Sequence, residues 1–371
     1  MSGAGAGADA DAAWVSELVR VGESETGGGR GVFASQDIRA GTLLIEEEPY
    51  VFPAGDGVRP LHVHIAEHLL RTGDDAAFGE LHPQSLDVLG PEERAAGEGQ
   101  HGERADAMVA GSGEFAHLDR DTVLRTLLAV QFNAFDSGLY HVQSMVNHGC
   151  SPNATKSTPP GLSCSRIVAC QDIKSGQEIT IHYAAPVERS WEYRASTLRQ
   201  QHYFALGPSP FGDQLDGPLD KAQGECARDL EARMDEGGDN SLDAALAILD
   251  AAHESLPVSH LVTTRAYKGL LTALLSALST APDVTLALTV LATVLEIQTR
   301  QAQYLGPDHL DVAATWEDLE HILSFLLSHD PDALFASYPN VYGSFRTASK
   351  SESVAKKHKN RIRRLYDPPS N

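Results

Sequence analysis

The chain has 371 residues, of which 42% are hydrophobic, and a formal net charge of -22 at pH 7. This length predicts two or three domains, and no apolar run reaches the ~18–20 residues that a membrane-spanning helix needs. So acidic a balance disfavours direct nucleic-acid binding, which requires clustered cations, and is compatible with a basic protein substrate. The four cysteines are too few for a disulfide framework and no secretory signal opens the chain, so we expect an intracellular protein of the cytoplasm, the nucleus or both.

The first fifty residues predict a short disordered start and then strands. Residues 1–12 are mostly alanine, glycine and aspartate, which predicts disorder. A strand pattern runs from Trp14 to Val21, and the glycine-rich stretch 27–34 is either a flexible loop tip or a backbone that approaches a ligand closely. The pattern ASQDIRAG at 34–41 returns as ACQDIKSG at 169–176, each copy between two strand-like runs. We therefore predict a small β unit of two similar halves that are separated by an insertion.

The insertion, residues 54–120, is predicted to be helical and partly mobile. A helical pattern runs from Pro60 to Leu70, whereas residues 90–113 lack hydrophobic periodicity and predict a mobile loop. Residues 119–135 are apolar at helical spacing, with Asp121 as the expected N-cap.

The last third of the sequence predicts helices. After a linker at 207–221, helical patterns cover 241–256, 263–278, 282–305 and 312–327, with Pro282 expected in a first helical turn. Residues 222–345 are therefore predicted to be a helical domain of paired antiparallel helices. The tail, 346–371, is rich in lysine and arginine and is interpreted as a nuclear-import patch, a contact to the acidic body, a solvated helix face or a disordered end.

Three motifs resemble the two halves of a SET domain, the fold of protein lysine methyltransferases. Residues 29–34 read GRGVFA, residues 147–153 read NHGCSPN, and the strand pattern 177–183 ends in a tyrosine. The resemblance covers residues 13–53 and 121–206. It implies an α+β protein that has a SET-type β-fold with a pseudoknot, a helical insertion and an all-α tetratricopeptide-like C-terminal domain.

The implied reaction is methyl transfer from S-adenosylmethionine to the lysine of a protein substrate. That lysine must be neutral, which costs on the order of 4–5 kcal/mol at pH 7 and favours an apolar, aromatic channel. By resemblance, Tyr183 is the catalytic tyrosine and Tyr140 lines the slot; the alternatives are a structural strand-end tyrosine and a packing residue. The implied cofactor contacts are Arg30, Gly31, Asn133, Ser144, Asn147, His148, Tyr183 and Phe204. For Asn133 and Ser144, the alternatives are a capping asparagine and a turn serine.

The chain departs from SMYD-type members of this family at their zinc sites. Leu206, Pro208 and Phe211 stand where those enzymes continue C-x-C-x-x-C, and Gly149 replaces a serine. With Cys150 alone, a tetrahedral thiolate site cannot form, so we predict no metal and an apolar plug of Leu206 and Phe211 instead. Residues 54–120 contain no cysteine, so the zinc-binding MYND finger is absent as well.

Other functions also fit parts of the sequence. Residues 64–68, HIAEH, match the inverted zinc-peptidase pattern, and His148 with Cys150 could form a nucleophile pair. A catalytically weak or inactive SET protein could act as an adaptor through its helical C-terminal domain, binding a protein partner there, and a small-molecule substrate is a further alternative. We predict an S-adenosylmethionine-dependent protein-lysine N-methyltransferase.

Overall fold

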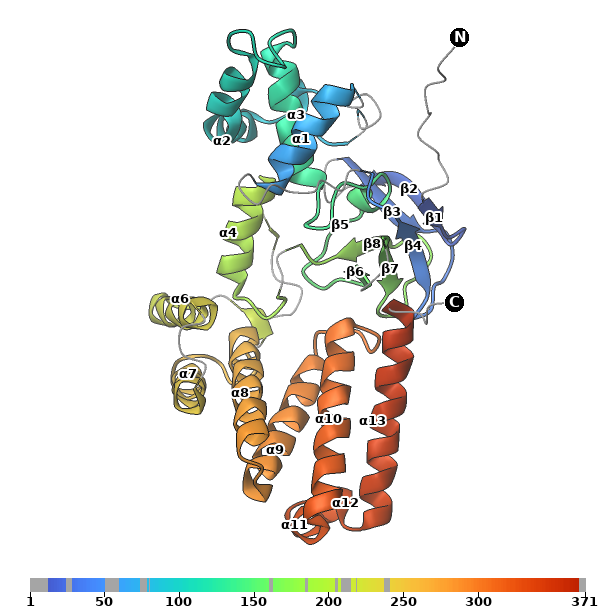
Figure 1. Ribbon diagram of the computed structural model, residues 1–371, viewed down its shortest axis with the longest axis vertical. Coiled ribbons are helices and arrows are strands. Elements are labelled where there is room, and N and C mark those ends of the chain that lie inside the picture. The colour runs from blue at the N-terminus through green and yellow to red at the C-terminus, as the bar shows by residue number, and fades with distance from the viewer. Residues whose placement is uncertain are drawn as a thin grey trace. The chain divides into compact units, whose positions relative to one another are not determined.

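The computed structural model describes most of the chain as two compact units (Figure 1). The described residues are 13–24, 29–50, 60–73, 79, 81–159, 163–183, 186–203, 206–207, 215–217, 219–236 and 241–366. Within them, the sheet unit comprises the described parts of 1–148, 156–181 and 198–205, and the helical unit comprises those of 149–155, 182–197 and 206–371. No helix in this described part of the chain has the length and hydropathy that a membrane crossing requires.

Two four-stranded sheets form the centre of the sheet unit, which confirms the predicted α+β class. The first has the order β1-β4-β7-β6 and the second β2-β3-β8-β5. The strands are β1 Ala13–Val15, β2 Val19–Ser24, β3 Gly29–Ala34, β4 Leu43–Glu47, β5 Asn147–His148, β6 Ala154–Ser157, β7 Ser165–Ala169 and β8 Glu178–Ile181. β8 pairs antiparallel with β3 and parallel with β5, so it joins the N-terminal and C-terminal segments of the unit.

The two copies of the repeated pattern face each other, as a unit of two similar halves requires. Ile38 and Ile173 exchange both backbone hydrogen bonds, at 2.8 and 2.9 Å. The Ala40 amide donates to Asp172 at 2.9 Å, and its counterpart, the Ser175 amide, donates to Asp37 at 3.0 Å. The closing glycines of both copies, residues 41 and 176, have φ of 83°, a left-handed conformation that glycine adopts without steric cost.

The insertion contains a long helix where the sequence predicts a mobile loop. Residues 91–109 form α2 (Pro91–Val109), which lies between α1 (Leu61–Thr72) and α3 (Arg120–Asn133) along the chain. The helix begins at Pro91, and the preceding Gly90 amide donates to Glu93 at 2.7 Å. Its buried positions are small or polar, namely Gly97, His101, Gly102 and Ala105. The prediction was wrong because this face packs by close approach and carries no hydrophobic periodicity.

Close packing and ion pairs hold α2 on α3. A Cβ atom at Gly97 would lie 3.0 Å from the Leu128 side chain, so glycine lets the two helices approach each other. Arg120 donates to Glu98 at 2.8 and 3.0 Å and to Asp106 at 2.6 Å. The N-cap of α3 is Asp119, whose carboxylate accepts from the Thr122 amide at 3.2 Å, and not the predicted Asp121.

The helices of the helical unit pack around a large apolar core, and a smaller apolar cluster lies at Val187, Leu261, Tyr304 and Leu305. Residues of α4 (Trp191–His202) belong to both units, and the later helices are α6 Lys221–Glu236, α7 Leu242–Ser255, α8 Leu261–Thr280, α9 Val284–Gln301, α10 Leu310–His329, α11 Pro331–Ser337, α12 Pro339–Tyr342 and α13 Phe345–Tyr366. Four of the predicted helices correspond to α7, α8, α9 and α10. Pro282 lies before α9, because Asp283 is the N-cap and accepts from the Leu286 amide at 2.8 Å.

The basic tail is ordered as α13 up to Tyr366, where it packs along α10 (Figure 1). Lys359 pairs with Glu320 at 2.6 Å, and Arg363 pairs with Glu317. The Tyr366 hydroxyl donates to the Asp308 carbonyl at 2.7 Å. Of the interpretations given for the tail, the structure shows a contact of its cations with acidic side chains of the body.

Candidate active site

Asn147 connects the strands that carry the predicted cofactor-binding residues. Its amide nitrogen donates to the Arg30 carbonyl at 3.0 Å and to Glu178 Oε1 at 2.6 Å, while Ser24 donates to the other Glu178 oxygen at 3.0 Å. A Cβ atom at Gly31 would fall on the Glu178 carboxylate, so the glycine makes room for this contact. The two bonds use the amide nitrogen of Asn147, and its Oδ1 is the atom that can accept a hydrogen bond from a ligand ammonium group.

Asn133 and Ser144 hold the backbone that leads into Tyr140. Asn133 Nδ2 donates to the carbonyls of His82 and Ala129 at 2.6 and 2.7 Å. Ser144 donates to the Asn133 carbonyl at 2.8 Å and accepts from the Tyr140 amide at 3.3 Å. These bonds use the Asn133 donors and the single Ser144 donor, so a ligand could be held by Asn133 Oδ1, by the remaining Ser144 lone pair or by the backbone.

Glu47 fixes the loop between Tyr140 and Ser144. Its carboxylate is 2% exposed and accepts from three consecutive backbone amides: His141 at 2.6 Å, Val142 at 3.2 Å and Gln143 at 3.0 Å. Charge-assisted bonds of this kind are about twice as strong as neutral ones. The carboxylate therefore holds the backbone of residues 141–143, which directly follow Tyr140.

Tyr140, Phe135 and Ser137 surround the amine of Lys156, and we call this arrangement the aromatic slot. Lys156 Nζ lies 4.5 Å from the Phe135 ring centroid and 4.9 Å from that of Tyr140. It donates to Ser137 Oγ at 2.8 Å, and the Tyr140 hydroxyl donates to the same oxygen at 3.0 Å. Burial lowers the pKa of Lys156 to about 8, although Asp136 and Glu47 oppose this shift. Burial also raises the pKa of Tyr140.

The other predicted site residues are His148, Tyr183 and Phe204. His148 pairs with Ile181 across β5 and β8, and Tyr183 follows two residues after β8 ends, half-buried and assigned to the helical unit. Phe204 lies outside the described residues. The sheet unit therefore brings together Arg30 and Gly31 on β3 with Asn147 and His148 on β5, the two strands that flank β8, and separately Asn133, Tyr140 and Ser144.

Cys150 stands where SMYD-type proteins have one of their zinc cysteines, and in this chain it contacts an ion pair. Cys150 lies beside Arg194 and Asp216, a fully buried ion pair, and burial raises the pKa of its thiol. Leu206 is half-buried, while Pro208 and Phe211 lie outside the described residues. Among the residues that the structure does describe, no three His, Cys, Asp or Glu side chains gather as a metal site would require.

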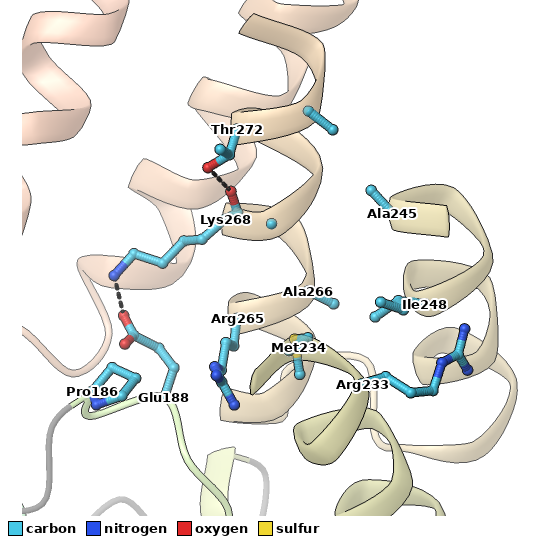
Figure 2. Close-up of a pocket in the computed structure, with 12 residues that line it drawn as sticks. Pro186, Glu188, Arg233, Met234, Ala245, Ile248, Arg265, Ala266, Lys268 and Thr272 are labelled. Atoms are coloured by element: carbon cyan, nitrogen blue, oxygen red, sulfur yellow. Dashed lines mark hydrogen bonds and ion pairs between the residues drawn. The ribbon is translucent and has the colours of Figure 1, made fainter. Parts of the chain in front are cut away.

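A cavity of about 340 Å³ opens in the helical unit (Figure 2). Met234, Ala245, Ile248 and Ala273 form an apolar wall, and Arg233, Arg265, Lys268 and Glu188 supply charge. Lys268 points to the buried Glu188, with Nζ 2.8 Å from Oε1, and also donates to Asp311 at 2.9 Å. Burial opposes the charge of Lys268, but these carboxylates outweigh it and raise its pKa.

Sequence reasoning missed Glu47, Glu178 and Lys156 as parts of the site. Glu178 stands inside the strand motif 177–183, but the roles of both glutamates depend on which backbone amides and strands the fold brings to them. Lys156 lies in a short strand next to residues 147–153, and the sequence does not show which face of that strand its side chain occupies.

Comparison with known proteins identifies the region that holds these residues. Residues 29–184 match the SET domain family model. A protein-lysine N-trimethyltransferase, SMYD5, from Gallus gallus is 38% identical over 88 residues, which is 23% of this chain and 21% of that protein. Its counterpart from Homo sapiens is 40% identical over 74 residues, covering 19% of this chain and 18% of that protein. The matched segment thus spans about a fifth of the length of these relatives.

A solved structure also aligns with this chain. The crystal structure of the SET domain of LSMT bound to lysine and AdoHcy covers 94% of this chain and 89% of its own, at 12% identity and a TM-score of 0.38.

Proposed function

We propose, from the premise that residues 29–184 of this chain are a SET domain, that the protein is an S-adenosylmethionine-dependent protein-lysine N-methyltransferase. The observation that carries the proposal is the aromatic slot. Phe135 and Tyr140 already surround the amine of a lysine, and the surroundings lower the pKa of that amine to about 8. A pocket that accepts a lysine side chain between two rings and weakens its hold on the proton suits the acceptor of a methyl transfer.

When bound, S-adenosylmethionine would supply an electrophilic methyl group on a sulfonium. The residues of this chain then have three tasks: to hold the amino-acid end of the cofactor, to keep the acceptor amine neutral and to align it. For the first task we propose Asn147 Oδ1 as acceptor for the cofactor ammonium, with the His148 backbone next to it on β5 and Arg30 on β3, beyond β8. Asn147 suits this role because its Nδ2 already donates to the Arg30 carbonyl and to Glu178, and these two bonds fix the orientation of its amide.

For the second and third tasks we propose the slot residues together with Tyr183. The rings of Phe135 and Tyr140 exclude water, which disfavours the ammonium form of an incoming lysine. The Glu47 carboxylate keeps the Tyr140 loop in place. The Tyr183 hydroxyl, at the end of the strand motif, is proposed to face the acceptor nitrogen and the transferred methyl group. The substrate class is a protein that presents a lysine side chain.

Two measurements on the full chain test the proposal. Isothermal titration with S-adenosylmethionine should give saturable binding, and incubation with methyl-labelled S-adenosylmethionine should label a lysine-rich protein pool on lysine. Binding without transfer would leave the adaptor alternative, and absence of both would refute the proposed function.

One observation favours the adaptor alternative as a second candidate. The cavity of the helical unit combines an apolar wall with the guanidinium groups of Arg233 and Arg265 (Figure 2), which suits a protein segment that pairs apolar and acidic side chains. Its test is titration of the chain with peptides of that composition and with basic peptides of matched length. Equal affinity for both would remove the charge argument.

A further inference from the structure

Lys156 is held differently from an ordinary surface lysine of the same unit. Within the described residues its Nζ makes one hydrogen bond, to Ser137, and otherwise lies against the Phe135 and Tyr140 rings. Lys174 is the useful contrast, because its side chain is 74% exposed and it pairs with Asp37 at 2.8 Å. The Asp37 carboxylate raises the pKa of Lys174, whereas burial lowers that of Lys156 to about 8.

The slot therefore presents an amine that is partly neutral near physiological pH. With a pKa of about 8, roughly one Lys156 in ten is neutral at pH 7, compared with about one in three thousand for a lysine of pKa 10.5. The charged groups that face this amine are the carboxylates of Asp136 and Glu47, and the Tyr140 hydroxyl lies beside it. The neutral fraction is thus raised even though both carboxylates favour the cation.

We propose that Lys156 is a self-methylation site: the chain transfers a methyl group to the lysine that its own aromatic slot holds. This inference rests on the proposed function. It adds a modification site and assigns the slot an internal acceptor that an external lysine must displace. The contacts with both rings carry the inference, together with the hydrogen bond to Ser137, which is the one that Nζ makes within the described part of the chain.

The step balances with one sulfonium donor and no other reagent. The neutral Nζ lone pair forms a bond to the methyl carbon, and the carbon–sulfur bond breaks with its electron pair remaining on sulfur. The products are S-adenosylhomocysteine and a secondary ammonium, which can release one proton to solvent.

The experiment incubates the full chain with methyl-labelled S-adenosylmethionine and maps modified lysines by mass spectrometry after cleavage at acidic residues. Label on Lys156 is expected, with a rate per molecule that does not change with protein concentration, as a reaction within one chain requires. Lys156→Arg should abolish this label, while the matched control Lys174→Arg should keep it. Phe135→Leu admits water to the slot and should lower labelling at pH 7 at least tenfold.

The pH profile separates the slot amine from an accidental acceptor. Labelling of Lys156 should rise about tenfold per unit below pH 8 and level off above it, whereas an ordinary lysine continues to rise toward pH 10. Label on a lysine-rich protein pool with none on Lys156 would overturn the inference and leave the proposed function intact. Absence of donor binding and of all transfer would overturn both.

Discussion

Replacing Lys156 with methionine should stabilise the sheet unit at pH 7. The folded protein lowers the pKa of this lysine from 10.5 to about 8, a difference of about 2.5 units. At about 1.36 kcal/mol per unit, holding the cation in the slot costs on the order of 3 kcal/mol below pH 8. Methionine has a similar length and no charge, so Lys156→Met should recover roughly 2–3 kcal/mol of unfolding free energy.

Because the pKa of Lys156 is lowered in the folded protein, the stability difference between Lys156→Met and wild type should depend on pH. Below pH 8 the lysine is protonated in the folded and the unfolded chain, so the full cost applies. Between pH 8 and 10.5 the unfolded chain binds more protons than the folded chain, and wild-type stability rises relative to the variant. Above pH 10.5 both forms are neutral, so the advantage of methionine should have disappeared.

The measurement is urea denaturation from pH 7 to 10.5, with the folded fraction of the sheet unit determined by pulsed subtilisin cleavage and peptide mapping. Lys174→Met is the control, because it removes an exposed lysine that pairs with Asp37 and should give no gain. A Lys156→Met variant that is less stable than wild type at pH 7, or whose gain does not shrink as the pH rises, would show that the slot does not strain this lysine.

Three further predictions concern the site. Tyr183→Phe should abolish or strongly reduce methyl transfer and leave the dissociation constant for S-adenosylmethionine nearly unchanged; an unaltered turnover would exclude a catalytic role for this hydroxyl. Asn147→Ala should weaken cofactor binding by about 1–3 kcal/mol, measured by isothermal titration, because a polar partner is lost in a partly buried position; equal affinity would contradict the assigned contact. Glu47→Gln should speed amide hydrogen exchange in residues 141–143, since one of the two accepting oxygens is replaced by a donor, while the exposed neighbour variant Glu48→Gln should not; unchanged exchange would mean that Glu47 does not fix the loop.

Local sequence patterns were sufficient for much of the fold. The repeated pattern predicts its strand–turn–strand units because each glycine turn and its flanking strands lie within a few residues of one another. Helices α7 to α10 follow from hydrophobic spacing, because each buries an apolar face in the core of the helical unit. Helix α2 was not predicted because its buried face contains Gly97, His101 and Ala105, and these residues give no hydrophobic periodicity.

The site was predictable in its motifs and not in its contacts. Asn147 could be selected from residues 147–153, but its bond to Glu178 depends on the strand order β3-β8-β5, which no local pattern contains. The amine of Lys156 reaches Phe135 and Tyr140 only because β6 turns this side chain inward. In a four-residue strand, a shift of one position would direct it to the other face, so sequence alone could not have decided its orientation.

The two facing copies of the repeated pattern, residues 34–41 and 169–176, make equivalent hydrogen bonds that can be removed one at a time. Asp37 accepts from the Ser175 amide and lies beside Lys174, and Asp172 accepts from the Ala40 amide and lies beside Arg39. Removing either aspartate breaks the same bond in a chemically equivalent place. A difference in stability between the two aspartate variants therefore measures how far the environments of the two copies have diverged, because each copy is the reference for the other.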